Sequence, residues 1–110
     1  IFTMSTSEAL PDYDPALKAY HAAFEPELEA AVRRYELAPD ARVLDCPCGD
    51  GFYAKLIARH MRSGTLTAAD LSPSYLAHAK EAVGTPPRGL GVRFAKADAY
   101  RLPFDDASFD

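Results

Sequence analysis

The sequence predicts an α/β fold, in which helices pack against an open sheet of parallel strands. The first observation is an apolar strand, a turn with two glycines and a helix, which follow one another between Val43 and Ala54. The second is the alternation of strand-like and helix-like segments, which favours right-handed crossovers and a parallel sheet ordered 3-2-1. The third is an acidic residue at the end of each expected strand: Asp45, Asp70 and Asp98.

Composition is that of an ordinary globular domain. The 110 residues are 48% hydrophobic and 25% charged, with a net charge of -4, and suffice for one compact unit. This mild acidity argues against non-specific nucleic-acid binding, which depends on clustered Lys and Arg. No apolar run approaches the roughly 20 residues that span a bilayer, and no basic start with an apolar core marks a signal peptide. We therefore expect a cytoplasmic protein without a membrane span.

Three regions are expected along the chain. Residues 1–12 are a flexible N-terminus whose first three residues precede Met4, the natural start, and are interpreted as part of a tag. Residues 13–38 are a helical cover, and residues 39–110 form the ligand-binding half of a domain.

The helical cover is expected to hold two helices, Pro15–Phe24 and Glu27–Tyr35, because Pro26 divides them. The second helix carries an apolar stripe at spacings of three and four residues, which we expect to pack on the sheet. The stripe consists of Leu28, Ala31, Val32 and Tyr35.

Helix signals also follow the first two strands. A helix over Phe52–Met61 is expected to end at Ser63-Gly64. The next helix should begin at Ser72, a favourable N-cap residue followed by proline, and run toward Gly84.

The turn after the first strand has the chemistry of a nucleotide-binding loop. A helix N-terminus leaves backbone N–H groups unpaired, so the turn can hold an anionic group at the positive end of the helix dipole. Gly49 and Gly51 allow the main chain to approach a ligand closely. Asp70 follows Gly51 by 19 positions, close to the spacing of about 20 at which an acid binds ribose in dinucleotide folds.

These motifs resemble those of the N-terminal half of a class I S-adenosylmethionine-dependent methyltransferase, of the type that includes the small-molecule methyltransferases of quinone biosynthesis. The resemblance covers roughly residues 13–110, and it implies a Rossmann-like three-layer αβα fold truncated before strand 4. Four motifs carry it in the family's order: Val43–Ala54, Asp70–Leu76, Lys96–Phe104 and the approach to the fourth strand at Phe104–Asp110.

The resemblance implies S-adenosyl-L-methionine as the cofactor and gives roles to the loop residues. Asp45 and the loop containing Pro47, Gly49 and Gly51 would hold the methionine part, and Asp70 would accept hydrogen bonds from both ribose hydroxyls. A carboxylate suits a vicinal diol because it accepts two hydrogen bonds at once. Pro47 stands where the family has its first glycine, so one main-chain donor is absent there.

The adenine end of the cofactor would be held by residues after the second and third strands. The resemblance implies that Asp98 and the Ala99 N–H bind the adenine edge, and that Leu71 and Tyr75 line the slot for its ring. Taken alone, each acid could instead cap the following helix or turn.

The two cysteines, Cys46 and Cys48, do not suggest a metal centre. A structural zinc site has four ligands, and His21, His60 and His78 lie in helical stretches away from the cysteines. We expect no metal, and small packing roles for both thiols.

Aromatic residues near the start of the chain have two interpretations. Tyr13, Tyr20 and Phe24 resemble part of the helical cover found in many relatives, where a tyrosine reaches the cofactor or the acceptor pocket. The favoured interpretation is that their rings are buried against the sheet.

The function expected from these features is methyl transfer from S-adenosylmethionine to a small molecule, with this chain as the donor-binding half and inactive alone. No catalytic residue can be named. Two alternatives remain: an NAD(P)-binding oxidoreductase fragment, since Gly49–Ala54 also fits a dinucleotide fingerprint, and a cofactor-binding module without turnover. The unpaired edge of the first strand is a site for self-association.

Overall fold

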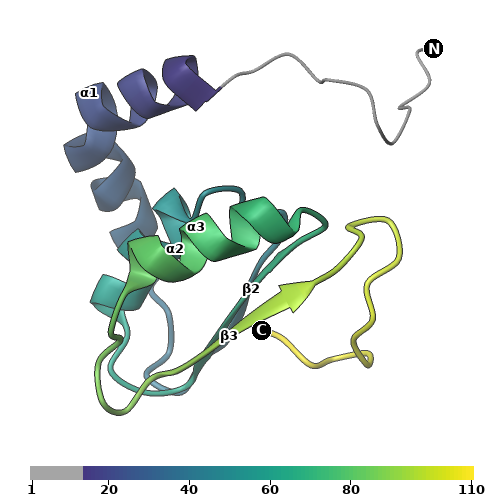
Figure 1. The fold of residues 1–110 in the computed structure, drawn as a ribbon. Coiled ribbons are helices and arrows are strands. Elements are labelled where there is room, and N and C mark those ends of the chain that lie inside the picture. The colour runs from purple at the N-terminus through teal and green to yellow at the C-terminus, as the bar shows by residue number, and fades with distance from the viewer. Residues whose placement is uncertain (1–13) are drawn as a thin grey trace.

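The computed structural model describes residues 14–110, and this part of the chain forms an open parallel sheet flanked by helices (Figure 1). The strands are β1 (Arg42–Asp45), β2 (Thr65–Asp70) and β3 (Gly91–Lys96), in the order β1-β2-β3. Both pairings are parallel, with Leu44 opposite Thr67 and Thr67 opposite Arg93. The predicted α/β class and the 3-2-1 strand order are confirmed.

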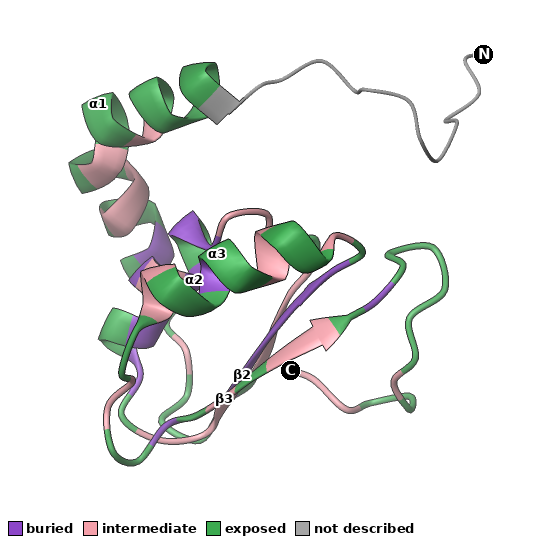
Figure 2. Cartoon of the chain, in the orientation of Figure 1, coloured by how far each residue is buried: buried purple, intermediate pink, exposed green. Residues whose placement is uncertain are grey.

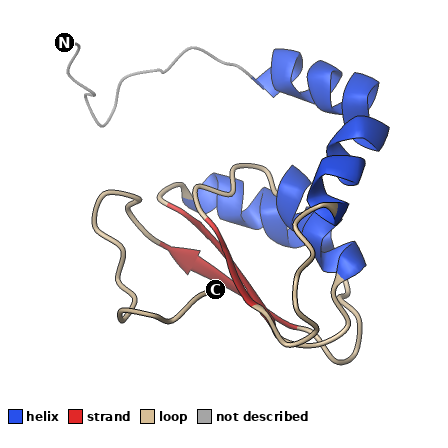
Figure 3. Cartoon of the chain, turned by 180° about the vertical axis from the view of Figure 1, so that it is seen from behind, coloured by secondary structure: helices blue, strands red, loops and turns tan. Residues whose placement is uncertain are grey.

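Helices α2 (Phe52–His60) and α3 (Pro73–Val83) lie on one face of the sheet (Figure 3). Their contact with the sheet is made by small and branched apolar side chains that are fully buried, including Leu56 of α2 and Leu66 of β2. The same buried cluster includes Ala79 of α3, where a small side chain lets the helix approach closely. Figure 2 shows the buried segments gathered where the helices meet the sheet. Within the described residues 14–110, no helix combines the length and apolar character needed to cross a bilayer.

The predicted start of α3 is confirmed. The Ser72 hydroxyl accepts a hydrogen bond from the Tyr75 N–H at 3.2 Å, and Pro73 opens the helix. Gly84 follows the last turn with φ of 62°. The helix α2 is one residue shorter than expected, because Met61 already has extended backbone angles.

The two helices expected before the sheet are one helix, so the predicted division at Pro26 is wrong. Helix α1 (Asp14–Arg33) continues through Pro26, and Figure 1 shows that it is bent. Proline removes one backbone donor and crowds the preceding turn, which bends a helix and need not end it.

Contacts between α1 and α2 hold the second half of α1 in place. Glu25 lies 3.5 Å from the Lys55 ammonium, and Glu29 lies 3.1 Å from the His60 ring. Of the predicted apolar stripe, Val32 is buried, whereas Tyr35 follows the helix end and is 58% exposed. The expectation that Tyr35 packs on the sheet is therefore wrong.

The aromatic rings of the first half of α1 are not buried against the sheet, which corrects the favoured interpretation. Tyr20 and Phe24 are about half exposed and contact each other, with ring centroids 5.1 Å apart. The neighbouring His21 does reach the body of the domain, where it stacks on Phe52. Tyr13 and residues 1–12 lie outside the described residues.

The outer edge of β1 is paired at its first residue by the C-terminal segment. The Asp110 N–H donates to the Arg42 carbonyl, and the Arg42 N–H donates to the Asp110 carboxylate, each at 2.8 Å. The Arg42 guanidinium also donates to Asp110 at 3.0 Å. Residues 104–109 thereby lie over the face of the sheet that α2 and α3 leave uncovered (Figures 1 and 3).

Candidate functional site

The loop between β1 and α2 depends on two glycines for different reasons. Both have positive φ, 54° at Gly49 and 89° at Gly51. A Cβ at Gly51 would lie 2.5 Å from the Ala79 Cα, so α3 packs directly on this residue. A Cβ at Gly49 would meet no atom within 4 Å, so the main chain there borders open space. Gly51 therefore permits close packing, and Gly49 leaves room beside the loop.

The loop is tied to the end of β2 by backbone hydrogen bonds. The Cys48 N–H donates to the Ala69 carbonyl at 2.8 Å, and the Gly49 N–H donates to Asp70 Oδ2 at 2.9 Å. Pro47 lies before these contacts, and the Cys46–Pro47 peptide is cis.

Asp70 organises the loop as well as standing at the predicted ligand edge. Its second oxygen, Oδ1, accepts the Ser72 N–H at 2.9 Å, so one carboxylate joins the glycine loop to the start of α3. Only 8% of Asp70 is exposed. A carboxylate has about four lone-pair positions, so both oxygens retain capacity for further donors. The bond to Ser72 agrees with the alternative that each acid caps the following turn, for which Asp-x-Ser is the pattern of an Asx turn. The bond to the Gly49 amide was not predicted from the sequence.

Asp45, at the end of β1, has a side-chain oxygen without a hydrogen-bond partner among the described residues. Its Oδ2 is buried and has no hydrogen-bond partner among the described residues. Burial, and then the negative charge of Asp70, raises the pKa of Asp45 from 3.8 to about 6. A positively charged donor placed at Oδ2 would satisfy this atom and favour the ionised carboxylate.

The charges of the three predicted acids all act on Cys46, which follows β1. The pKa of its thiol is raised first by burial and then by the charges of Asp70, Asp45 and Asp98. The sheet therefore gathers all three carboxylates at the edge formed by the carboxyl ends of its strands.

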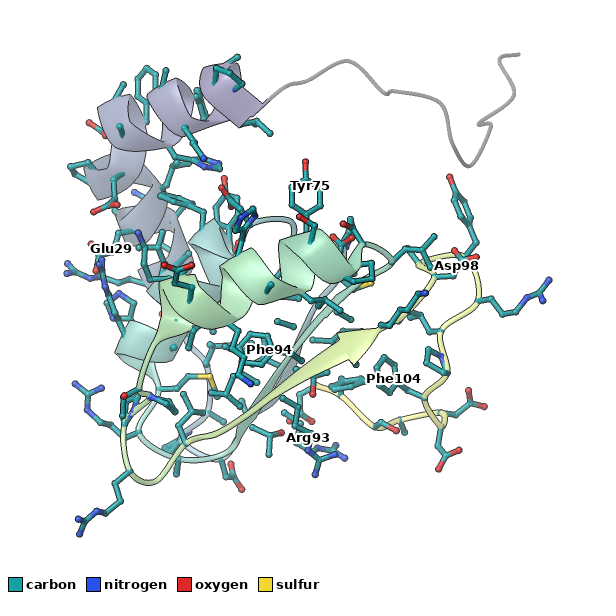
Figure 4. The ribbon with its side chains drawn as sticks, in the orientation of Figure 1. Glu29, Tyr75, Arg93, Phe94, Asp98 and Phe104 are labelled. Atoms are coloured by element: carbon teal, nitrogen blue, oxygen red, sulfur yellow. The ribbon has the colours of Figure 1, made fainter. Side chains whose placement is uncertain are left out.

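The residues predicted at the adenine end lie on the exposed rim. Asp98 is exposed, and its Oδ1 accepts the Tyr100 N–H at 2.9 Å, which makes a turn after β3. Ala99 is also exposed, as is 57% of Leu71. Figure 4 shows Asp98 beyond the tip of β3 and Tyr75 projecting from α3.

Cys48 has the environment of a packing residue, whereas Cys46 is only partly buried. Cys48 is buried, and burial raises the pKa of its thiol to about 12. Across residues 14–110, no group of three or more His, Cys, Asp or Glu side chains is placed to hold a metal ion.

Comparison of the sequence with known proteins shows which family the chain belongs to. Residues 43–110 match the methyltransferase domain family. The chain is 36% identical over 106 residues to the demethylmenaquinone methyltransferase of Thermus thermophilus, with 94% of this chain and 47% of that protein covered. It is 36% identical over 94 residues to the trans-aconitate 2-methyltransferase of Streptomyces avermitilis, covering 83% and 35% respectively.

A solved structure supports the same relationship. A Bacillus halodurans protein provisionally assigned as a methyltransferase superposes with a TM-score of 0.63 at 26% identity, over 74% of this chain and 34% of that one. The chain therefore belongs to the methyltransferase domain family. It spans about half or less of the length of these relatives.

Proposed function

We propose that this chain is the donor-binding half of an S-adenosylmethionine-dependent methyltransferase that acts on a small molecule. The observation that carries the proposal is the buried Oδ2 of Asp45, which has no hydrogen-bond partner within residues 14–110 and lies near the negative charge of Asp70. Family membership supports it independently.

The charge of the edge distinguishes between the candidate cofactors. The methionine part of S-adenosylmethionine carries an ammonium and a sulfonium, both of which are stabilised by neighbouring carboxylates. A dinucleotide would bring an anionic pyrophosphate to the same loop, where Asp45 would repel it. The acids therefore favour a methyl donor over NAD(P), although the glycine spacing fits both.

Residues of this chain would hold the cofactor as follows. Asp45 would accept a hydrogen bond from the ammonium, and the loop at Pro47, Gly49 and Gly51 would lie against the methionine part. Asp70 would accept the ribose hydroxyls on the lone pairs left free by its two backbone donors.

The adenine would lie at the exposed rim. Leu71 would cover one face of the ring, while Asp98 and the Ala99 N–H would face its polar edge. Since 57% of Leu71 is exposed in the structure, ligand binding would bury apolar surface there.

The bound cofactor supplies a methyl group already activated by its positive sulfur. The protein's part is then to hold an acceptor in line with that methyl group, and this requires few catalytic side chains. The acceptor is proposed to be a small molecule because relatives are named for such substrates. A cofactor-binding module without turnover is the second candidate, since this chain covers only part of those enzymes.

Calorimetry on this chain tests the proposal. S-adenosylhomocysteine should bind and NAD should not. Asp45→Asn should weaken binding by about 1.5–3 kcal/mol, the range for a hydrogen bond to a charged group. Asp106→Asn, an exposed acid of the C-terminal segment, is the matched control and should leave affinity unchanged.

Two results would count against the proposal. Tighter binding of NAD than of S-adenosylhomocysteine would favour the oxidoreductase, and equal affinity for the Asp45 and control variants would remove Asp45 from the site. Turnover of a labelled methyl donor by the longer protein would exclude the module without turnover.

A further inference from the structure

A groove with a basic wall lies between the ends of α2 and α3, and we call it the basic groove. Its volume is about 540 Å³, within the roughly 300–1,000 Å³ of small-molecule sites. Lys55, Arg59 and Arg62 line one wall, and their spacing of four and three residues keeps them on one face of α2 and its continuation. The loop that follows α3 begins beside the end of α2 and forms the other side of the groove (Figure 1).

The wall opposite the cations is apolar. Val83 is the last residue of α3, and Pro86 and Pro87 belong to the loop toward β3. All three are only partly buried, so they keep accessible apolar surface in the groove. A ligand bound here would therefore contact cations on one side and hydrocarbon on the other.

The described residues that line the basic groove include no acid. This composition differs from that of the whole chain, which has 16 acidic and 12 basic residues. It also differs from the edge beside the glycine loop, where the charges of Asp45, Asp70 and Asp98 act together. The basic groove therefore attracts anions, whereas the donor edge repels them.

Acidic side chains of α1 neutralise only part of the positive charge of the groove. Glu25 lies 3.5 Å from the Lys55 ammonium and 3.9 Å from the Arg59 guanidinium, and Glu29 lies 3.9 Å from Arg59. Ion pairs between such partly exposed side chains contribute little to stability. Lys55 and Arg59 can therefore contact a ligand anion at small cost.

Arg62 bonds to carbonyl groups and to no acid among the described residues. Its Nη1 donates to the carbonyls of Arg59 and Met61 at 3.0 and 3.3 Å, which holds the guanidinium at the end of α2 and offsets the negative end of the helix dipole. The other N–H donors of this guanidinium, on Nε and Nη2, stay available for a ligand. Gly89 packs directly on the Arg62 carbonyl, and its exposed neighbour Arg88 adds positive charge at this end.

We propose that the basic groove binds a small phosphate monoester with an apolar body. The phosphate would lie among Lys55, Arg59 and Arg62, because arginine binds phosphate oxygens through paired hydrogen bonds. The apolar body would lie against Val83 and the two prolines. The basic groove is separate from the glycine loop, so this inference does not rest on the proposed function.

The test titrates the ¹⁵N-labelled chain with three probes and follows its amide signals by NMR. 2-Naphthyl phosphate carries both parts of the proposed ligand, 2-naphthol lacks the phosphate, and inorganic phosphate lacks the apolar body. We expect 2-naphthyl phosphate to shift the signals of residues 55–62 and 82–85, and to bind at least about tenfold more tightly than either other probe. Its affinity should fall as the salt concentration is raised, because the phosphate contacts are ionic.

Two pairs of variants test the charge of the groove. Ala82→Glu adds an acid to the lining, and Ala82→Gln adds the same shape without charge. The Glu variant should bind 2-naphthyl phosphate about fivefold or more weakly than the Gln variant. Arg59→Gln should weaken binding by about threefold or more. Arg93→Gln removes an arginine on the sheet face away from α3 (Figure 4) and should leave the affinity unchanged. An unchanged thermal midpoint shows that each variant folds.

Equal affinity for 2-naphthyl phosphate and 2-naphthol would overturn the proposal, as would inorganic phosphate binding as tightly as the monoester. Equal effects within either pair of variants would also overturn it. S-adenosylhomocysteine is added at the end of the titration, and the shifts of residues 55–62 should persist. Their loss would mean that the probe occupies the donor site, which contradicts the proposal.

Discussion

Replacing Gly51 by Ala tests whether close packing on α3 shapes the glycine loop. The added Cβ would lie 2.5 Å from the Ala79 Cα and 3.1 Å from its carbonyl oxygen, both backbone atoms that cannot rotate away. Overpacking of this kind costs about 1–3 kcal/mol. A φ of 89° adds about 1–2 kcal/mol for a residue with a side chain. The expected loss is about 2–5 kcal/mol, a large part of the 5–15 kcal/mol by which domains are typically stable.

Gly49→Ala is the matched control for this substitution. Its φ is also positive, but its Cβ would meet no atom within 4 Å, so only the backbone cost of about 1–2 kcal/mol applies. Urea denaturation followed by circular dichroism gives the free energy of unfolding of both variants. Equal losses would refute the reasoning, because the contact with Ala79 would then have no cost.

Two further substitutions test the electrostatics of the site and the start of α3. The pKa of Asp45 is about 6 in the folded protein and 3.8 as the ordinary value, so between these pH values the folded state keeps a proton that the unfolded chain releases. The free energy of unfolding, measured by urea melts at stepped pH, should therefore fall as pH rises from about 4 to 6. Asp45→Asn should flatten this slope. A rise in the free energy of unfolding over the same range would contradict the raised pKa of Asp45. Ser72→Ala should lower the free energy of unfolding by about 1 kcal/mol through loss of the N-cap bond to Tyr75. Ser74→Ala, at an exposed position in the same turn, should change it by less than about 0.5 kcal/mol in the same assay, and equal effects would show that the cap contributes nothing.

Local signals in the sequence predicted the elements that surround the site. Ser72 followed by proline marks the start of α3 because both residues act on the first turn itself. Strand order follows from the alternation of strands and helices, since crossovers of one hand leave few arrangements. Features determined by neighbours in sequence were therefore predictable.

Features determined by tertiary contacts were not predictable in the same way. Pro26 suggests a helix end, but contacts of Glu25, Glu29 and Val32 with the rest of the domain hold the chain in one bent helix. Tyr20 and Phe24 are large aromatic residues of the kind usually found in a core. The bent course of α1 leaves them half exposed.

Positions of the three acids could be predicted, but their hydrogen-bond partners could not. The spacing of Asp70 indicates that it lies at the ligand edge, and its bond from the Ser72 amide is local, whereas its bond from the Gly49 amide depends on how the loop folds back on β2. The absence of a partner at Asp45 Oδ2, seen within the described residues, likewise depends on burial by surrounding elements.

A crystal structure of this chain with S-adenosylhomocysteine tests most directly whether the acids beside the glycine loop form the donor site. We predict that the ligand's amino nitrogen lies within hydrogen-bond distance of Asp45 Oδ2 and its ribose hydroxyls at Asp70, which keeps its bonds to Gly49 and Ser72. Ligand density away from this loop, or an Asp45 Oδ2 still without a partner, would contradict the assignment.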